Sequence, residues 1–65
     1  MKIGRHLRKK RHKKSLSQQE VADFIGVSQR TYSNFESNNS IPSIAQLVKL
    51  SKLFEFDFLN LFKIK

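Results

Sequence analysis

Helix-start and helix-stop signals follow one another at short intervals in the middle of the chain. Residues 17–20 read Ser-Gln-Gln-Glu. This is the pattern of a capping box, in which the serine hydroxyl accepts from an amide of the first turn and the glutamate accepts from the serine amide. Gly26 can end that helix in the left-handed conformation, and Ser28 can cap a further helix over residues 29–36. The sequence therefore predicts two short helices joined by a tight turn.

Similar signals predict a helix on either side of this pair. Ile3 and Leu7 lie on one stripe of residues 2–13, which indicates a first helix with a thin apolar face. Pro42 precedes a second possible capping box at residues 43–46, where another helix should begin. The apolar residues expected on the second and fourth helices are Val21, Ala22, Phe24 and Ile25, and Ile44, Leu47, Val48, Leu50 and Phe54.

The C-terminal segment allows two structures. Residues 54–58 read Phe-Glu-Phe-Asp-Phe, and this alternation by itself argues for a strand. Asp57, however, is a good helix cap. Helical spacing also relates Phe58, Leu61 and Phe62. We therefore expect a short fifth helix, with an intersubunit strand over residues 59–64 as the alternative.

Positive charge is concentrated at the N-terminal end of the chain. The 65 residues carry 13 Lys and Arg against 5 Asp and Glu, a formal net charge of +8. Residues 2–14 contain no acidic side chain, and the later cations equal the acids in number, so the excess lies in this segment. Such a concentration favours an oriented anionic partner over general solubility.

Several classes of protein are disfavoured by what the sequence lacks. There is no cysteine for a disulfide or a thiolate metal site, and His6 and His12 lie too far apart around a helix to share a metal ion. No apolar stretch suits a membrane span or a signal peptide. No nucleophile or glycine-rich phosphate loop supports catalysis. We expect a cytoplasmic protein without enzyme activity, metal or cofactor. A chain this short is marginally stable alone, which favours a second copy.

The predicted helix over residues 29–36 has an exposed face suited to reading DNA. At about 100° per residue, one arc carries Gln29, Arg30, Ser33 and Asn34. Arginine can bond O6 and N7 of guanine, and glutamine or asparagine can bond N6 and N7 of adenine. A helix with this chemistry fits the major groove of double-stranded DNA.

The ordered set of motifs resembles a known family. The motifs occupy residues 16–22, 26–28, 32–36, 41–43 and 47–50. In this order and spacing they resemble the helix-turn-helix domains of phage repressor and Cro type, also called xenobiotic-response-element type regulators. The resemblance implies an all-α fold of five helices in a single domain over residues 1–65. It also implies binding to double-stranded DNA as a homodimer, on a pseudo-palindromic operator, to repress or activate transcription.

The resemblance also assigns roles to individual residues. It places Gln29, Arg30, Ser33 and Asn34 at base-reading positions. The expected phosphate contacts near this helix are Gln18, Ser28, Ser37, Asn38 and Asn39. Arg11 and Glu36 are expected to form a partly buried ion pair between the first and third helices.

Three departures from the family pattern carry further hypotheses. Family members commonly mix acids into the end of the first helix, whereas this chain has none, so we expect phosphate contacts from some of Arg8, Lys9, Lys10, Lys13 and Lys14. Glu55 stands where the family usually has glycine, which puts the bend after the fourth helix in doubt. Apolar residues stand where small or polar ones are usual and predict an exposed dimer patch formed by Leu53, Phe56, Phe58, Leu59 and Phe62.

Two other functions stay open at this point. The apolar C-terminal patch would also suit a protein-interaction module, such as an antitoxin, with DNA binding secondary. The basic first helix alone would suit a non-specific polyanion binder.

Overall fold

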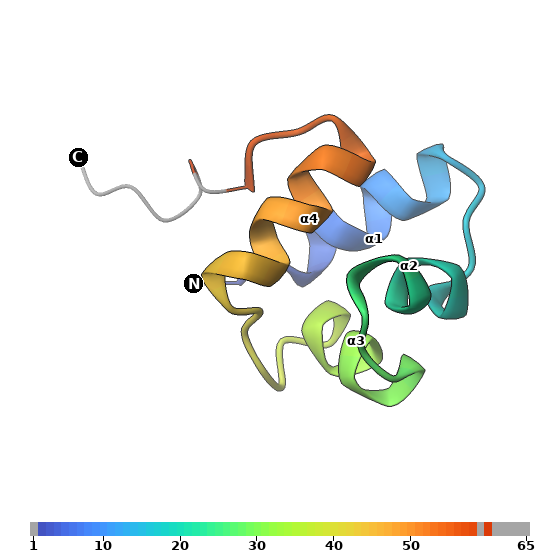
Figure 1. The fold of residues 1–65 in the computed structure, drawn as a ribbon, viewed down its shortest axis with the longest axis vertical. Coiled ribbons are helices and arrows are strands. Elements are labelled where there is room, and N and C mark those ends of the chain that lie inside the picture. The colour runs from blue at the N-terminus through green and yellow to red at the C-terminus, as the bar shows by residue number, and fades with distance from the viewer. Residues whose placement is uncertain (1, 59, 61–65) are drawn as a thin grey trace.

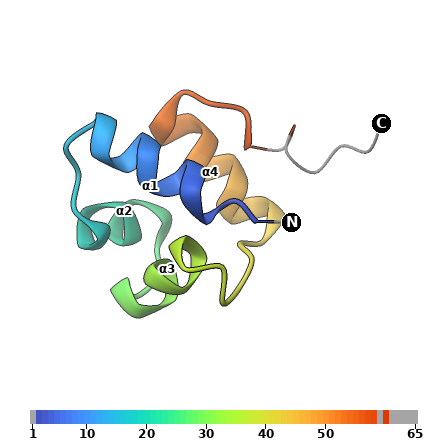
Figure 2. The same ribbon diagram turned by 180° about the vertical axis from the view of Figure 1, so that it is seen from behind.

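The computed structural model describes residues 2–58 and 60 and forms a four-helix arrangement in this part of the chain. The helices are α1 (Gly4–Lys13), α2 (Gln18–Ile25), α3 (Gln29–Glu36) and α4 (Ile44–Phe54). In both ribbon views α2 and α3 occupy one half of the molecule, and α1 and α4 cross in the other half (Figures 1 and 2). Helix α3 packs against α1 and α2, and α2 also packs against α4. The described residues contain no strand.

The helix boundaries follow the predicted caps. Ser17 and Glu20 form a complete capping box, with the Glu20 N–H donating to Ser17 Oγ over 3.0 Å and the Ser17 N–H donating to Glu20 Oε1 over 2.7 Å. Ser43 and Gln46 form the second box. Gly26 has a φ of 80° and a ψ of 33°, the left-handed conformation expected at the end of α2. These local predictions are therefore confirmed.

One apolar core lies between the helices. The described side chains that are fully buried at its centre include Leu7, Val21, Tyr32, Leu47, Leu50 and Phe58. Phe24 was expected on the buried side of α2 but is 54% exposed. Val21, Ala22 and Ile25 form the buried arc of α2, and Phe24 lies about 100° from the centre of that arc. The prediction for Phe24 is therefore wrong, because the apolar arc of this short helix is wider than its contact surface.

The bend after α4 forms without glycine. Glu55 has a φ of 55° and a ψ of 42°, so it adopts the left-handed conformation that glycine favours. Its N–H donates to the carbonyl of Ser51, and the Phe56 N–H donates to the same carbonyl over 3.1 Å. The geometry that seemed doubtful from the sequence is therefore retained, at the steric cost of a side chain in this region.

A fifth α-helix is absent from the described residues. After the bend, the Phe58 N–H donates to Ser51 Oγ over 3.2 Å, and the Asn60 N–H donates to the carbonyl of Asp57 over 3.2 Å. Phe58 and Asn60 have the conformation of a tight 3₁₀ turn. Leu59, Leu61 and Phe62 lie outside the described residues, as does most of the alternative strand over residues 59–64. Within its described part the fold is all-α with four helices.

The predicted apolar patch at the C-terminal end is smaller than expected. Phe58 is 0% exposed, so its expected place on the surface is wrong. Its ring makes edge contacts with the rings of Phe54 and Phe56, at centroid distances of 6.0 and 4.9 Å, and these contacts draw it into the core. Leu53 and Phe56 are half-buried and pack against the same core. The remaining members of the predicted patch, Leu59 and Phe62, lie outside the described residues.

Candidate nucleic-acid interface

Helix α3 exposes the residues with base-reading chemistry and buries its aromatic side. Tyr32 is 0% exposed and Phe35 is 3% exposed, and both belong to the core. On the other side, Gln29 and Arg30 are exposed, and Ser33 and Asn34 are half-buried. Within residues 2–58 and 60, Arg30 has no ion-pair partner. The start of α3 therefore presents a guanidinium and an amide to the surroundings on a rigidly packed helix.

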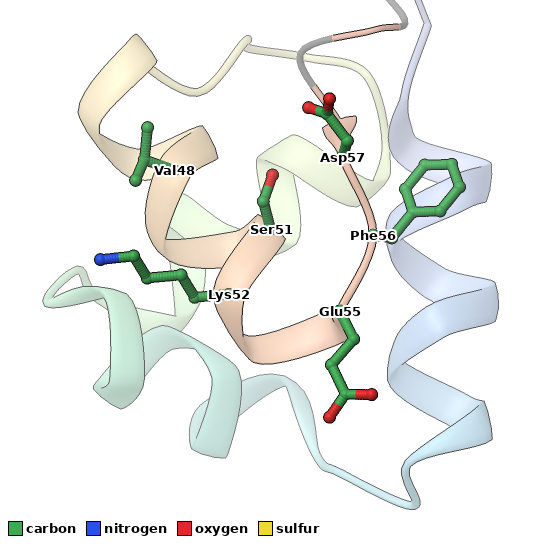
Figure 3. A pocket seen from close by; sticks show the side chains of 6 residues that line it. All are labelled: Val48, Ser51, Lys52, Glu55, Phe56 and Asp57. Carbon is green, nitrogen blue, oxygen red and sulfur yellow. The ribbon is translucent and has the colours of Figure 1, made fainter.

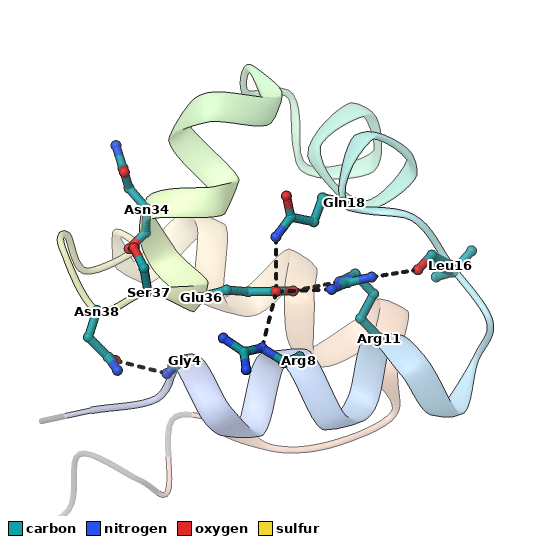
Figure 4. A network of polar contacts seen from close by, with 9 residues as sticks. All are labelled: Gly4, Arg8, Arg11, Leu16, Gln18, Asn34, Glu36, Ser37 and Asn38. Atoms are coloured by element: carbon teal, nitrogen blue, oxygen red, sulfur yellow. Dashed lines mark hydrogen bonds and ion pairs between the residues drawn. The ribbon is translucent and has the colours of Figure 1, made fainter.

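A buried carboxylate ties this helix to α1. The carboxylate of Glu36, in the last turn of α3, accepts from Arg11 Nε over 2.6 Å and from Arg11 Nη2 over 3.1 Å. This is a bidentate pair, the strongest geometry for arginine and carboxylate. Arg11 also donates to the carbonyl of Leu16 over 3.0 Å, which holds the loop before α2 (Figure 4). The two residues that the sequence pairs are thus in direct contact.

The same carboxylate contacts two further residues. Gln18 Nε2, at the start of α2, donates to Glu36 Oε1 over 3.1 Å, and Arg8 Nε lies 3.9 Å from that oxygen. Figure 4 shows these side chains converging on Glu36 from α1 and α2. An amide nitrogen carries two N–H donors, so Gln18 can bond Glu36 and still donate to a phosphate. The Arg8 side chain is 58% exposed and can do the same.

The electrostatics of this cluster follow from burial and pairing. Burial disfavours the charged form of Glu36, but hydrogen bonds from Arg11 and Gln18 and the charge of Arg11 outweigh it and lower the pKa of Glu36. The hydrogen bond to Glu36 in turn raises the pKa of Arg11. Burial raises the pKa of the neighbouring Tyr32 hydroxyl. The ion pair therefore stays charged at neutral pH.

Gly4 is essential to this junction, and sequence reasoning did not select it. A Cβ at Gly4 would lie 2.1 Å from the carbonyl oxygen of Glu36, so only glycine lets α1 begin this close to the end of α3. The Gly4 N–H donates to Asn38 Oδ1 over 3.0 Å. Asn38 has a φ of 66°, the left-handed conformation that asparagine adopts more readily than most residues. The only sequence signal was a glycine near a helix start, which does not reveal its neighbour.

The residues expected to touch phosphate near α3 differ in how they are used. Ser28 Oγ accepts from the Thr31 N–H over 3.1 Å and donates to Thr31 Oγ1, so its hydroxyl serves as the cap of α3. Asn38 uses its side-chain oxygen on Gly4. Ser37 and Asn39 are exposed in the same loop, where the Asn39 N–H donates to the carbonyl of Asn34 over 2.9 Å. The loop is thus held against both α1 and α3.

The cations of α1 do not form one group. Arg8 lies beside Glu36 on the α3 side, whereas Lys10 Nζ lies 4.4 Å from the centroid of the Phe56 ring. These two residues are about 160° apart around the helix. Lys9 and Lys13 line the same hollow as Lys10 and Phe56. The sequence predicted one phosphate-contacting set, and the structure distributes its members over opposite sides of α1.

Other kinds of site are not found in the described residues. None of their helices has the length and apolar character needed to cross a membrane. Residues 2–58 and 60 contain no cluster of three or more His, Cys, Asp or Glu side chains that could hold a metal ion.

The short helices α2 and α3, the glycine turn between them and the exposed polar face of α3 define a helix-turn-helix protein. Residues 7–60 match the helix-turn-helix family, and the chain therefore belongs to it, as the resemblance predicted. The chain is similar to the SPbeta prophage-derived uncharacterized HTH-type transcriptional regulator YonR of Bacillus subtilis (strain 168). The two are 38% identical over 51 residues, which cover 78% of this chain and 47% of YonR. The chain thus spans about half the length of that curated relative. No solved structure matches it.

Proposed function

We propose that this chain is a transcriptional regulator that binds double-stranded DNA in a sequence-specific manner, with α3 in the major groove. The observation that carries the proposal is the exposure of Gln29 and Arg30 on a helix whose Tyr32 and Phe35 are held in the core. Such a helix can enter a groove without unfolding its own packing. Arg30 reads guanine, Gln29 and Asn34 read adenine, and Ser33 adds a shorter contact.

Phosphate contacts flank α3 in this proposal. Gln18 and Arg8 contact the backbone from the two helices that meet at Glu36. Ser28, Ser37, Asn38 and Asn39 contact it from the two ends of α3. These groups position the duplex and carry no sequence information of their own.

The proposal includes a homodimer on a pseudo-palindromic operator. Its contact comprises Leu53 and Phe56, which are half-buried in one chain, together with Leu59 and Phe62. The small size of the chain supports it, since a second copy would add buried apolar surface. A two-fold pair would place two recognition helices about one DNA turn apart.

Selection of bound duplexes from a random DNA pool tests this function. We expect an enriched palindrome whose half-site spacing is about one helical turn. Arg30→Ala should weaken binding to the enriched duplex by about 1–3 kcal/mol and relax preference at one base pair, whereas Gln18→Ala should weaken all duplexes alike. A pool without enrichment, or equal losses of Arg30→Ala on enriched and unrelated duplexes, would contradict sequence-specific reading.

A second candidate function is a protein-interaction module, as in an antitoxin. Its support is an exposed apolar stripe that begins before α4 and continues along it: Ile41 and Ile44 are 60% and 65% exposed, and Val48 is 37% exposed. The stripe leads into a hollow of about 320 Å³ between α4 and the segment that follows it (Figure 3). Size measurement of the isolated chain separates the two functions, because a stable homodimer favours the operator-binding function and a monomer leaves this face for another protein.

A further inference from the structure

The side of α1 that faces away from α3 has a continuous basic surface. Three hollows adjoin along α1: His6 lines the first two, and Lys10 and Lys13 line the last two. Asn38, in the loop after α3, also lines the first hollow, so only the other two lie away from α3. The middle hollow has a volume of about 440 Å³. We name the part around the middle hollow the outer basic surface and define it by His6, Lys9, Lys10 and Lys13.

Acidic side chains neutralise little of this surface. Among the described residues, the ion pair on this side joins Lys14 to Glu55 over 3.6 Å, and the Glu55 side chain is 80% exposed. The buried carboxylate of Glu36 is on the other side of α1, where it binds Arg11. Lys9 and Lys13 form no ion pair within residues 2–58 and 60. The outer basic surface therefore carries a positive potential that an anionic partner can use.

Phe56 fixes the arrangement of this surface. Its ring lies 6.5 Å from the ring of His6, at an interplanar angle of 11°, and below the ammonium group of Lys10. Phe58 packs against the edge of the same ring. These contacts hold the half-buried ring of Phe56 beneath the cations.

The chemistry of the lining residues selects the class of partner. Among the described residues that line the middle hollow, Phe56 alone is apolar, and it is half-buried. A specific protein partner needs an apolar core to its interface, with charged residues mostly at the rim. A phosphate backbone needs only an array of cations. The 10 residues of α1 span about 15 Å, which matches about four phosphates of one DNA strand. The outer basic surface therefore suits a nucleic-acid backbone better than an acidic protein.

We infer that the outer basic surface binds the phosphate backbone of a second DNA duplex, so that one chain holds two duplexes at once. The geometry supports two separate contacts, because Lys10 and Arg8 are about 160° apart and, of these two, Arg8 lies at the α3 side. The inference rests on the proposed function in one respect, that the duplex bound by α3 occupies the opposite side of α1.

Capture of one duplex by another tests the inference. An enriched duplex from the random pool is fixed to beads, the protein is added, and retention of a labelled duplex of unrelated sequence is measured over a range of salt concentrations. We expect capture by the natural chain and a strong loss with the double substitution Lys9→Gln and Lys13→Gln. Each phosphate contact contributes about 0.9 to the slope of log affinity against log salt, so this slope should fall by about 1.8 for capture. Binding to the beads should be retained.

A matched control removes the same charge elsewhere. Lys49→Glu on α4 changes the net charge by the same amount as the double substitution, and capture should persist in this variant. A loss as large as that of the double substitution would overturn the inference, because it would reflect net charge alone. Failure of the natural chain to capture the labelled duplex would also overturn it.

Three further outcomes separate the inference from the proposed function. If the double substitution weakens binding to a single duplex as much as capture, these lysines and α3 touch the same duplex, and the inference fails. If Arg30→Ala abolishes capture between unrelated duplexes while the lysine substitutions preserve it, two recognition helices bridge the duplexes, and the inference again fails. If no sequence is enriched from the pool but capture between unrelated duplexes still depends on Lys9 and Lys13, the proposed sequence-specific reading fails and the second surface stands.

Discussion

The two sides of α1 use positive charge in opposite ways. On the α3 side, Arg11 is fixed by a bidentate bond to Glu36, whose side chain is 2% exposed. On the outer side, Lys9 and Lys13 are exposed and Lys10 rests on an aromatic ring. One helix therefore carries a structural charge on one side and available charges on the other. The composition of α1 does not distinguish these two uses, and only the position of each residue around the helix does.

The substitution with the largest expected effect on stability removes the buried carboxylate of Glu36. Glu36→Ala should lower the free energy of unfolding by about 3–5 kcal/mol, because it leaves Arg11 poorly solvated and unpaired. Chemical denaturation measures this change. Unchanged thermal stability of the variant would mean that Arg11 is no more structural than the lysines on the outer side.

The pH dependence of stability tests the role of the same carboxylate independently. The folded-state pKa of Glu36 is lowered from its usual value of 4.5, so the unfolded chain binds a proton more readily. The stabilisation that ionised Glu36 contributes is fully present above its usual pKa of 4.5 and is lost as the pH falls through the lowered folded-state pKa. The variant Glu36→Gln should show a weaker dependence of unfolding free energy on pH in this acidic range.

A smaller but still clear effect is expected at the start of α1. Gly4→Ala should lower the free energy of unfolding by about 1–3 kcal/mol, because the added Cβ meets the Glu36 carbonyl and forces the two helices apart. Thermal unfolding measures this loss of stability. Ala22→Gly is not a suitable control, because Ala22 is buried in the core. Lys2→Ala, at an exposed neighbouring position, is the suitable control and should change stability little. An unaltered unfolding midpoint for Gly4→Ala would show that the contact with α3 is not close.

The smallest effect is expected on the outer side. The double substitution Lys9→Gln and Lys13→Gln should change the free energy of unfolding by less than about 0.5 kcal/mol. The substitutions should raise the free energy of unfolding slightly, because the two lysines are four residues apart on one helix and repel each other. Denaturation of this variant beside Glu36→Ala tests the comparison directly. A loss of several kcal/mol would show that the outer lysines are structural as well.

The features that could be predicted from the sequence are those decided by neighbours in the chain. The capping boxes at Ser17 and Ser43 and the turn at Gly26 involve residues only a few positions apart, so their patterns identify the helix ends. The polar arc of α3 follows in the same way from helical spacing. Residues 7–60, which match the helix-turn-helix family, contain both capping boxes and the turn.

The features that escaped prediction depend on contacts between distant segments. Phe58 was placed on the surface because its spacing does not reveal that Phe54 and Phe56 draw it inward. The division of the α1 cations depends on where Phe56 and Glu36 lie around that helix. Gly4 is needed only because α3 ends against it. A periodic pattern reports that a face exists, but it does not report which segment packs there.

The junction between α1 and α3 also has a consequence for folding. The Gly4–Asn38 hydrogen bond joins residues that are 34 positions apart, whereas the serine hydroxyl of each capping box binds an amide 3 positions away. Closing the longer loop costs about 2 kcal/mol more in chain entropy. Docking of α1 is thus the step that chain entropy opposes most among these contacts, and burial of Leu7 in the core helps to offset that cost. The helix that carries most of the positive charge is therefore the one whose docking closes the longest loop among these contacts.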